Sequence, residues 1–385
     1  MQRPRQGSTT ALRRAAAALA ALAIVAAVAV AVAGWHFSNL LIRPGPNRPL
    51  EPGLVVAAVD DSTITLSGSR IARAGGTWFL EWPGGAGVAG ERLLASDSAT
   101  TRRFRRLAGR IAAGDRVDLR AYFYHSDPLV ACGLRFEQVS VSTERGTCPA
   151  WLVPGARPTW VVFVHGMNAG RGEALRLIPT VAALGLPSLT LTYRNDPAAP
   201  RGPDGLFHLG ASEWEDLEAG VRYALHQGAR RVVLVGFSMG GATIAEFLRR
   251  SALADSVAGV VFDSPVLDWE AVVARGARKE GGVAPLLVPV AKWIVSLRTG
   301  YRWADSGAKA WPRQFRTRAP VLLFHGTADG TVPHATSVAF ARAMGARVTL
   351  VTTEGADHVR SWNTDPHRYE ATLAAWLREV AEPTR

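Results

Sequence analysis

Lysine is nearly absent from this 385-residue chain, which contains only Lys279, Lys292 and Lys309. The formal net charge of +12 therefore comes from arginine. The arginines are scattered along the chain, and no nucleic-acid-binding motif accompanies them. We therefore expect no nucleic-acid partner, and the basic surface favours contact with anionic lipid or simple solubility.

Cysteine is also scarce, since the chain has only Cys132 and Cys148. Two cysteines are compatible with one disulfide in an exported protein. If residues 134–153 form a hairpin that turns near Gly146, however, Cys148 faces position 143 or 144, and Cys132 lies on the order of 30 Å further along that strand. A disulfide then requires the chain near Cys132 to fold back.

Apolar residues, by contrast, are plentiful: 48% of the chain is hydrophobic, 20% is charged and 12 residues are tryptophan. This composition builds a large core and excludes a low-hydrophobicity disordered chain. The length is sufficient for a membrane segment, a catalytic domain of about 250 residues and one small additional module.

The amino terminus carries an apolar run, residues 15–34, without a charged side chain. A helix over this run reaches roughly 30 Å, the thickness of a hydrocarbon core. The flanking arginines are Arg3, Arg5, Arg13 and Arg14 before the run and Arg43 and Arg48 after it. This arrangement indicates a transmembrane signal anchor, with residues 1–14 cytoplasmic and the body extracytoplasmic. The alternative is secretion after cleavage at 31–33, which the length of the run disfavours.

Two segments separate this run from the main body. Residues 35–52 are rich in proline and predict a semi-rigid spacer. The prolines are Pro44, Pro46, Pro49 and Pro52. Residues 53–131 contain short β-branched and aromatic runs between Gly or Asp turns, which predict a small β-rich module. No catalytic constellation is visible in it, so we expect a structural or docking appendage whose fold is not assigned.

Residues 132–385 alternate between strand and helix patterns, which predicts a mostly parallel, doubly wound sheet covered by helices on both faces. The expected strands are 159–164, 188–192, 231–235, 259–262, 321–324 and 348–352. The expected helices are 173–184, 212–226, 241–251, 335–344 and 368–380. Residues 265–316 interrupt the alternation with several tryptophans and prolines, so we expect a cap over the sheet edge.

The first catalytic signal is Gly236-Phe237-Ser238-Met239-Gly240, which follows an expected strand and opens an expected helix. Small residues two positions before and after the serine allow a sharp strand-to-helix turn that raises its hydroxyl above the sheet. The alternative, an ordinary Gly-rich turn, is weakened by this context. Ser238 is therefore the predicted nucleophile.

The second signal is Val161-Val162-Phe163-Val164-His165-Gly166-Met167, an expected strand that ends in His-Gly. Fixed backbone N–H groups stabilise the oxyanion of a tetrahedral intermediate. We expect the N–H groups of Met167 and Met239 to supply this oxyanion hole. His165 is expected to be structural, because the catalytic histidine of this triad type follows the serine.

The third and fourth signals follow the last two expected strands. Asp329 lies in the loop after 321–324, and His358 lies in the loop after 348–352. The chain order Ser, Asp, His is the one expected for this constellation, so Asp329 is the predicted acid and His358 the predicted base. Asp329 could otherwise be a turn residue, and Asp263 is the reserve candidate for the acid.

Residues from about 139 to 376 resemble the α/β-hydrolase superfamily, in the monoacylglycerol lipase-like branch of membrane-anchored hydrolases. The four motifs above carry this resemblance, together with residues 189–196 and 263–269. It implies an α/β-hydrolase fold with a helical cap insertion, preceded by the transmembrane helix and the small β-rich module. The module departs from the plain family pattern.

The resulting functional expectation is a serine esterase that acts on amphiphilic or lipid acyl esters and needs no metal or cofactor. Two alternatives remain open. A peptidase or amidase of the prolyl oligopeptidase-like kind uses the same triad order, although residues 53–131 are too few for the propeller of such enzymes. A non-catalytic scaffold or lipid-binding protein on the same fold is the other alternative.

Overall fold

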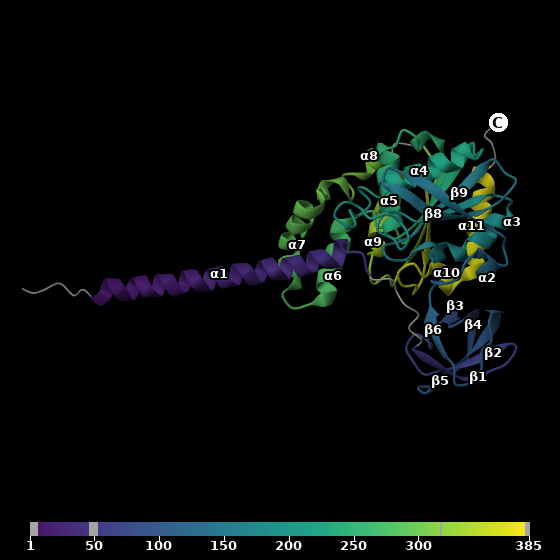
Figure 1. The fold of residues 1–385 in the computed structure, drawn as a ribbon, viewed down its shortest axis with the longest axis horizontal. Helices are drawn as coiled ribbons and strands as arrows, with labels where there is room; N and C mark the ends of the chain where they lie inside the picture. Colours follow the sequence, from purple (N-terminus) through teal and green to yellow (C-terminus); the bar gives the residue numbers. More distant parts are fainter. Residues whose placement is uncertain (1–6, 46–52, 316–317, 382–385) are drawn as a thin grey trace, which may run out of the picture.

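The computed structural model describes residues 7–45, 53–315 and 318–381. In this part of the chain a long amino-terminal helix, a small β-barrel and a larger α/β body follow one another (Figure 1). The helix α1 (Gly7–Ile42) projects far from the body, while the barrel lies against it. Most of the predicted spacer, residues 46–52, lies outside the described residues.

Helix α1 is long and apolar enough to cross a membrane over Leu12–Ile42, with a mean hydropathy of 2.7. Its most hydrophobic stretch is not buried by the rest of the protein. A signal sequence would satisfy the same criteria. The expected spacer was predicted to start at residue 35, which is wrong, because the helix continues without interruption to Ile42.

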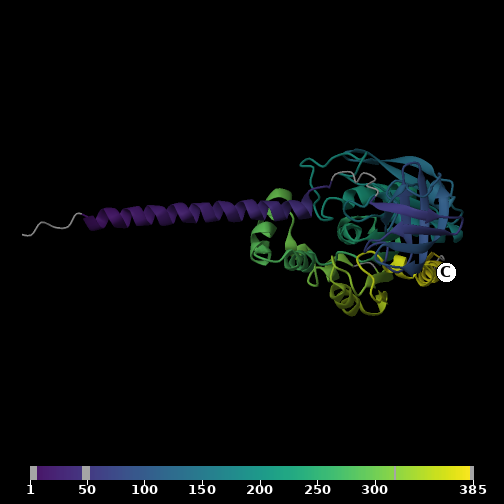
Figure 2. The ribbon, with the colours of Figure 1, turned by 90° about the horizontal axis from the view of Figure 1, so that it is seen from below.

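The last turns of α1 continue as helix because they pack on another helix, α7 (Ala284–Thr299), as both views show (Figures 1 and 2). A Cβ at Gly34 would lie only 2.6 Å from Val290 Cγ1, so the two backbones approach closely here. Arg298 of α7 donates hydrogen bonds to Ser38 Oγ (2.9 Å) and Asn39 Oδ1 (2.7 Å). These contacts hold the end of α1 against the body.

The predicted β-rich module is a closed six-stranded barrel in the order β1-β2-β5-β4-β3-β6. Its strands are β1 (Leu54–Val59), β2 (Thr63–Ser67), β3 (Trp78–Trp82), β4 (Gly85–Ala95), β5 (Ala99–Ala108) and β6 (Arg116–Arg120). Alternate residues such as Ile64 and Leu66 point inward and are fully buried. Closure through β1 and β6 pairs the strand edges that a small open sheet would expose.

The barrel is joined to the α/β body by specific contacts as well as by the chain. The side chain of Asn363, which is buried, donates to Thr77 O and Ala121 O, both at 2.8 Å. The next residue back, Trp362, stacks on Phe79 of β3 with ring centroids 5.3 Å apart. A buried amide that satisfies two backbone carbonyls is costly to disrupt, so these contacts fix the position of the barrel.

The α/β body contains an eight-stranded sheet in the order β14-β13-β12-β11-β9-β10-β8-β7. Its strands are β7 (Glu137–Thr143), β8 (Gly146–Val153), β9 (Thr159–Val164), β10 (Ser188–Leu191), β11 (Arg231–Phe237), β12 (Val257–Asp263), β13 (Val321–Gly326) and β14 (Val348–Thr353). The β7–β8 hairpin is antiparallel and joins β10 antiparallel, whereas all other neighbours pair parallel. Parallel strands buried on both faces explain their continuous apolar sequences.

Helices cover both faces of this sheet. One buried cluster contains residues of α4 (Trp214–His226), α5 (Met239–Arg250) and α9 (His334–Met344), and the other contains residues of α3 (Ile178–Ala183) and α11 (Pro366–Ala381). The expected single helix 173–184 is instead a 3-10 segment, Arg171–Arg176, followed by α3. Pro179 lacks a backbone N–H, so it suits the first turn of a new helix rather than a helix interior.

The expected insertion 265–316 contains α6 (Trp269–Glu280), α7, a 3-10 turn (Trp303–Asp305) and α8 (Trp311–Gln314). Helices α6 and α7 stand beside the body where α1 meets it (Figure 2). The indole N–H of Trp269 donates to Leu209 O (3.0 Å), which ties the insertion to the core, and that of Trp311 donates to Leu267 O (2.9 Å) within the insertion.

Both cysteines are free thiols. Cys132 ends the short helix α2 (Pro128–Cys132), and Cys148 lies in β8 opposite Val141. The hairpin turns at Glu144 and Arg145, next to the expected Gly146, and the partner of Cys148 is two or three residues earlier than predicted. Burial raises the pKa of each thiol to about 12, which makes both poorly reactive.

Candidate active site

Ser238 occupies the turn between β11 and α5 with a backbone φ of +48° and ψ of −115°. Such a conformation is strained for a residue with a side chain, and it is held by close packing on both sides. A Cβ at Gly240 would lie 2.2 Å from Val164 O, and one at Gly236 would lie 2.6 Å from Ile244 Cδ1. The two glycines therefore permit the turn that the motif predicted.

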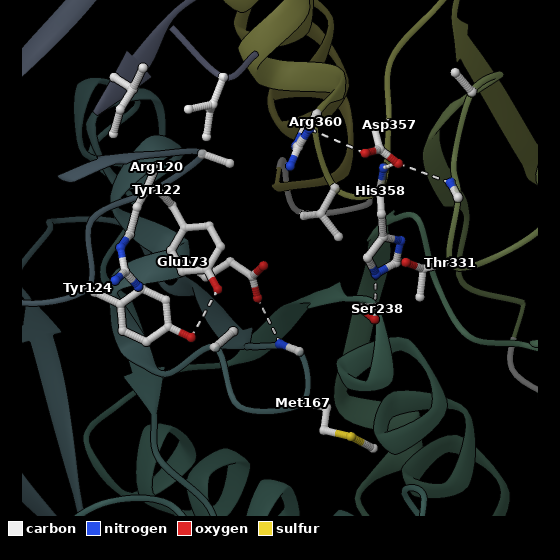
Figure 3. Close-up of a pocket in the computed structure, with 18 of the residues that line it drawn as sticks. Arg120, Tyr122, Tyr124, Met167, Glu173, Ser238, Thr331, Asp357, His358 and Arg360 are labelled. Atoms are coloured by element: carbon white, nitrogen blue, oxygen red, sulfur yellow. Dashed lines mark hydrogen bonds and ion pairs between the residues drawn. The ribbon is translucent and has the colours of Figure 1, made fainter. Parts of the chain in front are cut away.

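His358 approaches Ser238 from the loop after β14, and Asp329 approaches His358 from the loop after β13. The distance from His358 Nε2 to Ser238 Oγ is 2.9 Å, and from His358 Nδ1 to Asp329 Oδ2 it is 2.8 Å. Figure 3 shows the imidazole pointing at the serine. Because a carboxylate accepts at Nδ1, the ring carries its proton there and Nε2 is free to accept the serine proton.

The carboxylate of Asp329 is buried and fully engaged. Its Oδ1 accepts hydrogen bonds from the backbone N–H groups of Thr331 and Val332, each at 2.8 Å. Burial acts to raise the pKa of Asp329, but hydrogen bonds from His325 and His358 outweigh it, so the pKa lies well below its usual value. The side chain therefore stays ionised over the physiological pH range.

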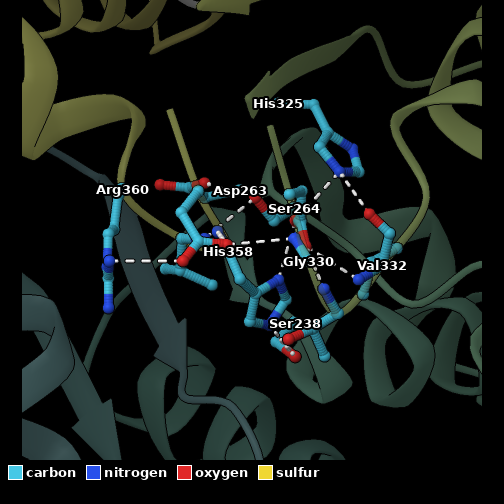
Figure 4. A network of polar contacts seen from close by, with 12 residues as sticks. Ser238, Asp263, Ser264, His325, Gly330, Val332, His358 and Arg360 are labelled. Atoms are coloured by element: carbon cyan, nitrogen blue, oxygen red, sulfur yellow. Dashed lines mark hydrogen bonds and ion pairs between the residues drawn. The ribbon is translucent and has the colours of Figure 1, made fainter. Parts of the chain in front are cut away.

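His325 is a second histidine on Asp329 that the sequence patterns did not single out. It is the penultimate residue of β13, and its Nε2 lies 3.1 Å from Asp329 Oδ2 and 3.2 Å from Val332 O. Its Nδ1 lies 2.7 Å from Ser337 Oγ. Figure 4 shows His325 and His358 on two sides of the loop that contains Gly330 and Val332. His325 therefore fixes the orientation of the carboxylate from behind.

The reserve candidate, Asp263, does not face the imidazole of His358. Its carboxylate accepts from Tyr369 Oη (3.2 Å) and Ser264 Oγ (3.3 Å), and its backbone carbonyl accepts the N–H of Ser238 (3.0 Å). Complete burial raises the pKa of Asp263 from its usual 3.8 to about 6. Its position supports the serine turn through the backbone rather than through its charge.

The loop after β9 brings Gly166 and Met167 beside Ser238. The N–H of Gly166 donates to Glu173 Oε2 at 2.7 Å, so it is already used. The carbonyl of Gly166 accepts from Tyr193 Oη at 3.1 Å. In a trans peptide the N–H of Met167 points opposite that carbonyl. This orientation, with Met239 N at the start of α5, is compatible with the predicted oxyanion hole.

His165 is buried away from the serine. Its Nε2 lies 2.7 Å from Asp196 Oδ2, and its Nδ1 lies 2.8 Å from Gly166 O. Burial opposes the charged form, but the charge of Asp196 and the hydrogen bonds raise the pKa of His165. With an acceptor at each nitrogen, His165 is a structural residue that anchors the loop carrying Met167.

A cavity of about 890 Å³ opens over Ser238 and His358 (Figure 3). The barrel and the segment after it form one of its walls. These residues are Arg70, Ile71, Leu119, Arg120, Ala121, Tyr122 and Tyr124. The expectation of a structural or docking appendage did not include this contribution. No local sequence pattern predicts that the barrel contributes to the cavity wall, because this contribution depends on docking between segments distant in the sequence.

The cavity wall carries more basic than acidic side chains, since Glu173 and Asp357 are its carboxylates. Its basic side chains are Arg70, Arg120, Lys279 and Arg360. Arg120 pairs with Asp118 (Nε to Oδ2 2.6 Å), and Arg360 pairs with Asp357 (3.2 Å). Among the residues that the structure describes, no group of His, Cys, Asp or Glu could hold a metal ion.

Strand order, the strained serine turn and the loop positions define a protein of the α/β-hydrolase fold. The prolyl oligopeptidase family matches residues 204–384. An esterase of Pyrococcus furiosus has a similar structure, with 21% sequence identity, a TM-score of 0.53, and coverage of 67% of this chain and 97% of that one. An esterase domain from Rhodothermus marinus is 20% identical over 64% of this chain and 100% of its own, with a TM-score of 0.45. No curated protein matches the chain.

Proposed function

We propose that this protein is a serine hydrolase that cleaves carboxylic esters, with Ser238 as nucleophile, His358 as general base and Asp329 as the acid that orients it. The observation that carries the proposal is the continuous hydrogen-bond chain from Ser238 Oγ through His358 to Asp329, at 2.9 and 2.8 Å. These lengths suit proton transfer without rearrangement. The reaction needs no metal or cofactor.

The mechanism has two halves. His358 Nε2 takes the proton of Ser238 Oγ as the oxygen attacks the acyl carbonyl carbon. The oxyanion accepts hydrogen bonds from Met167 and Met239 N–H, and the imidazolium then protonates the departing alcohol. Water next gives a proton to His358 and attacks the acyl-enzyme. The acid leaves, and Ser238 recovers its proton. The ionised Asp329 stabilises the imidazolium in both halves.

Amphiphilic or lipid esters are the proposed substrates. We propose that α1 is an uncleaved anchor, that residues 1–14 are cytoplasmic and that residues 53–131 and 132–385 lie outside the cytoplasm, because more arginines precede the apolar run than follow it closely. An anchor of this type keeps the active site close to a lipid surface. A neutral or anionic head group suits the cationic cavity wall.

Peptide or amide hydrolysis is the second candidate, and the match to the prolyl oligopeptidase family favours it. The cavity wall argues against aminopeptidase activity, because a substrate ammonium group requires unengaged carboxylates. Of the wall carboxylates, Glu173 accepts from Gly166 N–H and Asp357 pairs with Arg360. Comparing p-nitrophenyl esters with aminoacyl p-nitroanilides separates the two candidates, and faster anilide cleavage would favour the peptidase.

Labelling with a fluorophosphonate probe tests the catalytic assignment directly. We expect the wild-type protein to react at one serine and Ser238→Ala to lose all labelling and all ester hydrolysis. A folded wild-type protein that neither reacts nor hydrolyses any ester would instead support a non-catalytic scaffold.

A further inference from the structure

A second cavity, which we call the slot, lies between α1 and the α6–α7 hairpin. It has a volume of about 240 Å³. Most of its wall is apolar: Phe37, Leu40 and Leu41 from α1; Val272, Val273, Gly276 and Ala277 from α6; and Ala284, Val288 and Ala291 from α7. The helix with membrane-spanning composition thus forms part of a cavity wall in the body.

The slot borders the catalytic cavity. Lys279, Gly330 and Thr331 line both. Gly330 and Thr331 belong to the loop that carries Asp329, and Figure 3 shows Thr331 beside Ser238 and His358. Gly330 N–H also donates to Asp357 Oδ1 at 3.0 Å. An apolar chain in the slot therefore ends next to the catalytic residues.

Helix α7 of the hairpin also exposes large apolar side chains. Leu286, Trp293 and Leu297 of α7 are 79%, 65% and 70% exposed. Their spacing of seven and four residues places them on one stripe of the helix. Because α7 packs directly on the end of the apolar α1, the stripe continues the surface that would meet the bilayer.

From this arrangement we infer that the slot binds the acyl chain of a membrane lipid ester, which passes from the bilayer between α1 and α6–α7 to present its carbonyl to Ser238. The inference rests on the proposed esterase function and adds the substrate class and entry route. The helix that anchors the protein would then also form part of its substrate site. The polar head would remain in the cationic catalytic cavity.

The test is a substitution that fills the slot with a large side chain, at a position where the structure has room for one. A Cβ at Gly276 would meet no atom within 4 Å, so Gly276→Phe places a ring in the slot without a backbone clash. Arg278→Phe is the matched control, since Arg278 is an exposed residue of α6 outside the slot lining. Full-length protein in phosphatidylcholine–phosphatidylglycerol vesicles would be assayed with p-nitrophenyl esters of two to sixteen carbons.

Each methylene buried in the slot should raise kcat/KM by up to about fourfold, until the slot is full. We expect Gly276→Phe to lower the long-chain to short-chain ratio of kcat/KM at least tenfold, and Arg278→Phe to retain it. If the long-chain to short-chain ratio of kcat/KM is unchanged in Gly276→Phe, the slot assignment is overturned. Fluorophosphonate labelling and short-chain hydrolysis would still show that the proposed function is correct. A wild-type protein that neither reacts with the probe nor hydrolyses any ester would overturn the proposed function instead.

A second measurement does not depend on turnover. Ser238→Ala in the same vesicles would be irradiated with a diazirine-bearing palmitic acid, and cross-linked peptides would be identified by mass spectrometry. We expect cross-links within residues 37–41 and 272–277, reduced at least tenfold by the added Gly276→Phe substitution. Cross-links confined to other segments would overturn the proposal.

Discussion

Replacing Asp329 with asparagine should disable the reaction while leaving the loop in place. The amide oxygen of the asparagine can keep the two backbone hydrogen bonds from Thr331 and Val332, each 2.8 Å in the native protein. Its NH₂ group then occupies the position of Oδ2, 2.8 Å from His358 Nδ1. Because an NH₂ donates, Nδ1 must accept, and the ring proton moves to Nε2, where it faces Ser238.

In that tautomer His358 holds a proton on the nitrogen that must accept one. The wrong tautomer in triads of this type lowers kcat by about 10⁴-fold, which corresponds to about 5 kcal/mol of transition-state stabilisation. The assay is kcat for a short-chain p-nitrophenyl ester between pH 6 and 9, together with the rate of fluorophosphonate labelling. Circular dichroism checks that the variant is folded.

Asp357→Asn is the matched control. Its carboxylate is close to the same histidine, but it accepts from the backbone N–H groups of Gly330 (3.0 Å) and His358 (2.8 Å) rather than from the ring. Loss of charge at such hydrogen bonds should cost no more than about tenfold in kcat. If folded Asp329→Asn kept kcat within tenfold of the wild type, the assignment of Asp329 would be wrong.

Two further predictions concern the residues that support the serine turn. Asp263 has a pKa of about 6 in the folded protein against 3.8 as its usual value, so its contribution to stability is present below pH 3.8 and lost as the pH rises through 6. Asp263→Asn should therefore raise the free energy of unfolding at pH 8 by up to about 3 kcal/mol. At pH 4 the substitution should have little effect. Urea denaturation at both pH values measures the difference, and equal effects would contradict the prediction. A Cβ at Gly166 would lie 3.1 Å from Ser238 Cβ and 3.4 Å from Glu173 Oε2. Gly166→Ala should therefore displace the loop that carries Met167 and lower kcat roughly 10- to 100-fold. An unchanged kcat in a steady-state assay would show that this loop is not part of the site.

The local patterns were sufficient to predict the α/β sheet, because each parallel strand is an apolar run that ends in a turn with its own signature. They also placed Ser238, Asp329 and His358 at the carboxyl ends of strands β11, β13 and β14, which share one edge of the sheet. The chain order Ser, Asp, His fits both Asp329 and Asp263, and the structure places Asp329 rather than Asp263 at the imidazole of His358. The structure brings these three side chains into one hydrogen-bonded row.

Other parts of the site were not readable from local sequence. His325 looks like an ordinary strand-end residue until the turn after it folds Asp329 back onto its ring. Glu173 was expected only as the start of a helix, yet it holds the loop beside Ser238 by a hydrogen bond from Gly166. Their partners, Asp329 and Gly166, belong to recognised motifs, but the contacts themselves form only when the loops fold.

By itself, the sequence determined the apolar helix, the strand-and-helix alternation and the identities of the candidate triad, since each depends on periodicity or on a short motif. Only the tertiary structure decided that the barrel forms a wall of the catalytic cavity and that α1 lies on α7 beside α6. Docking depends on the shape and hydrogen bonding of surfaces assembled from distant segments. Neither segment's sequence by itself shows a periodic pattern that predicts this complementarity.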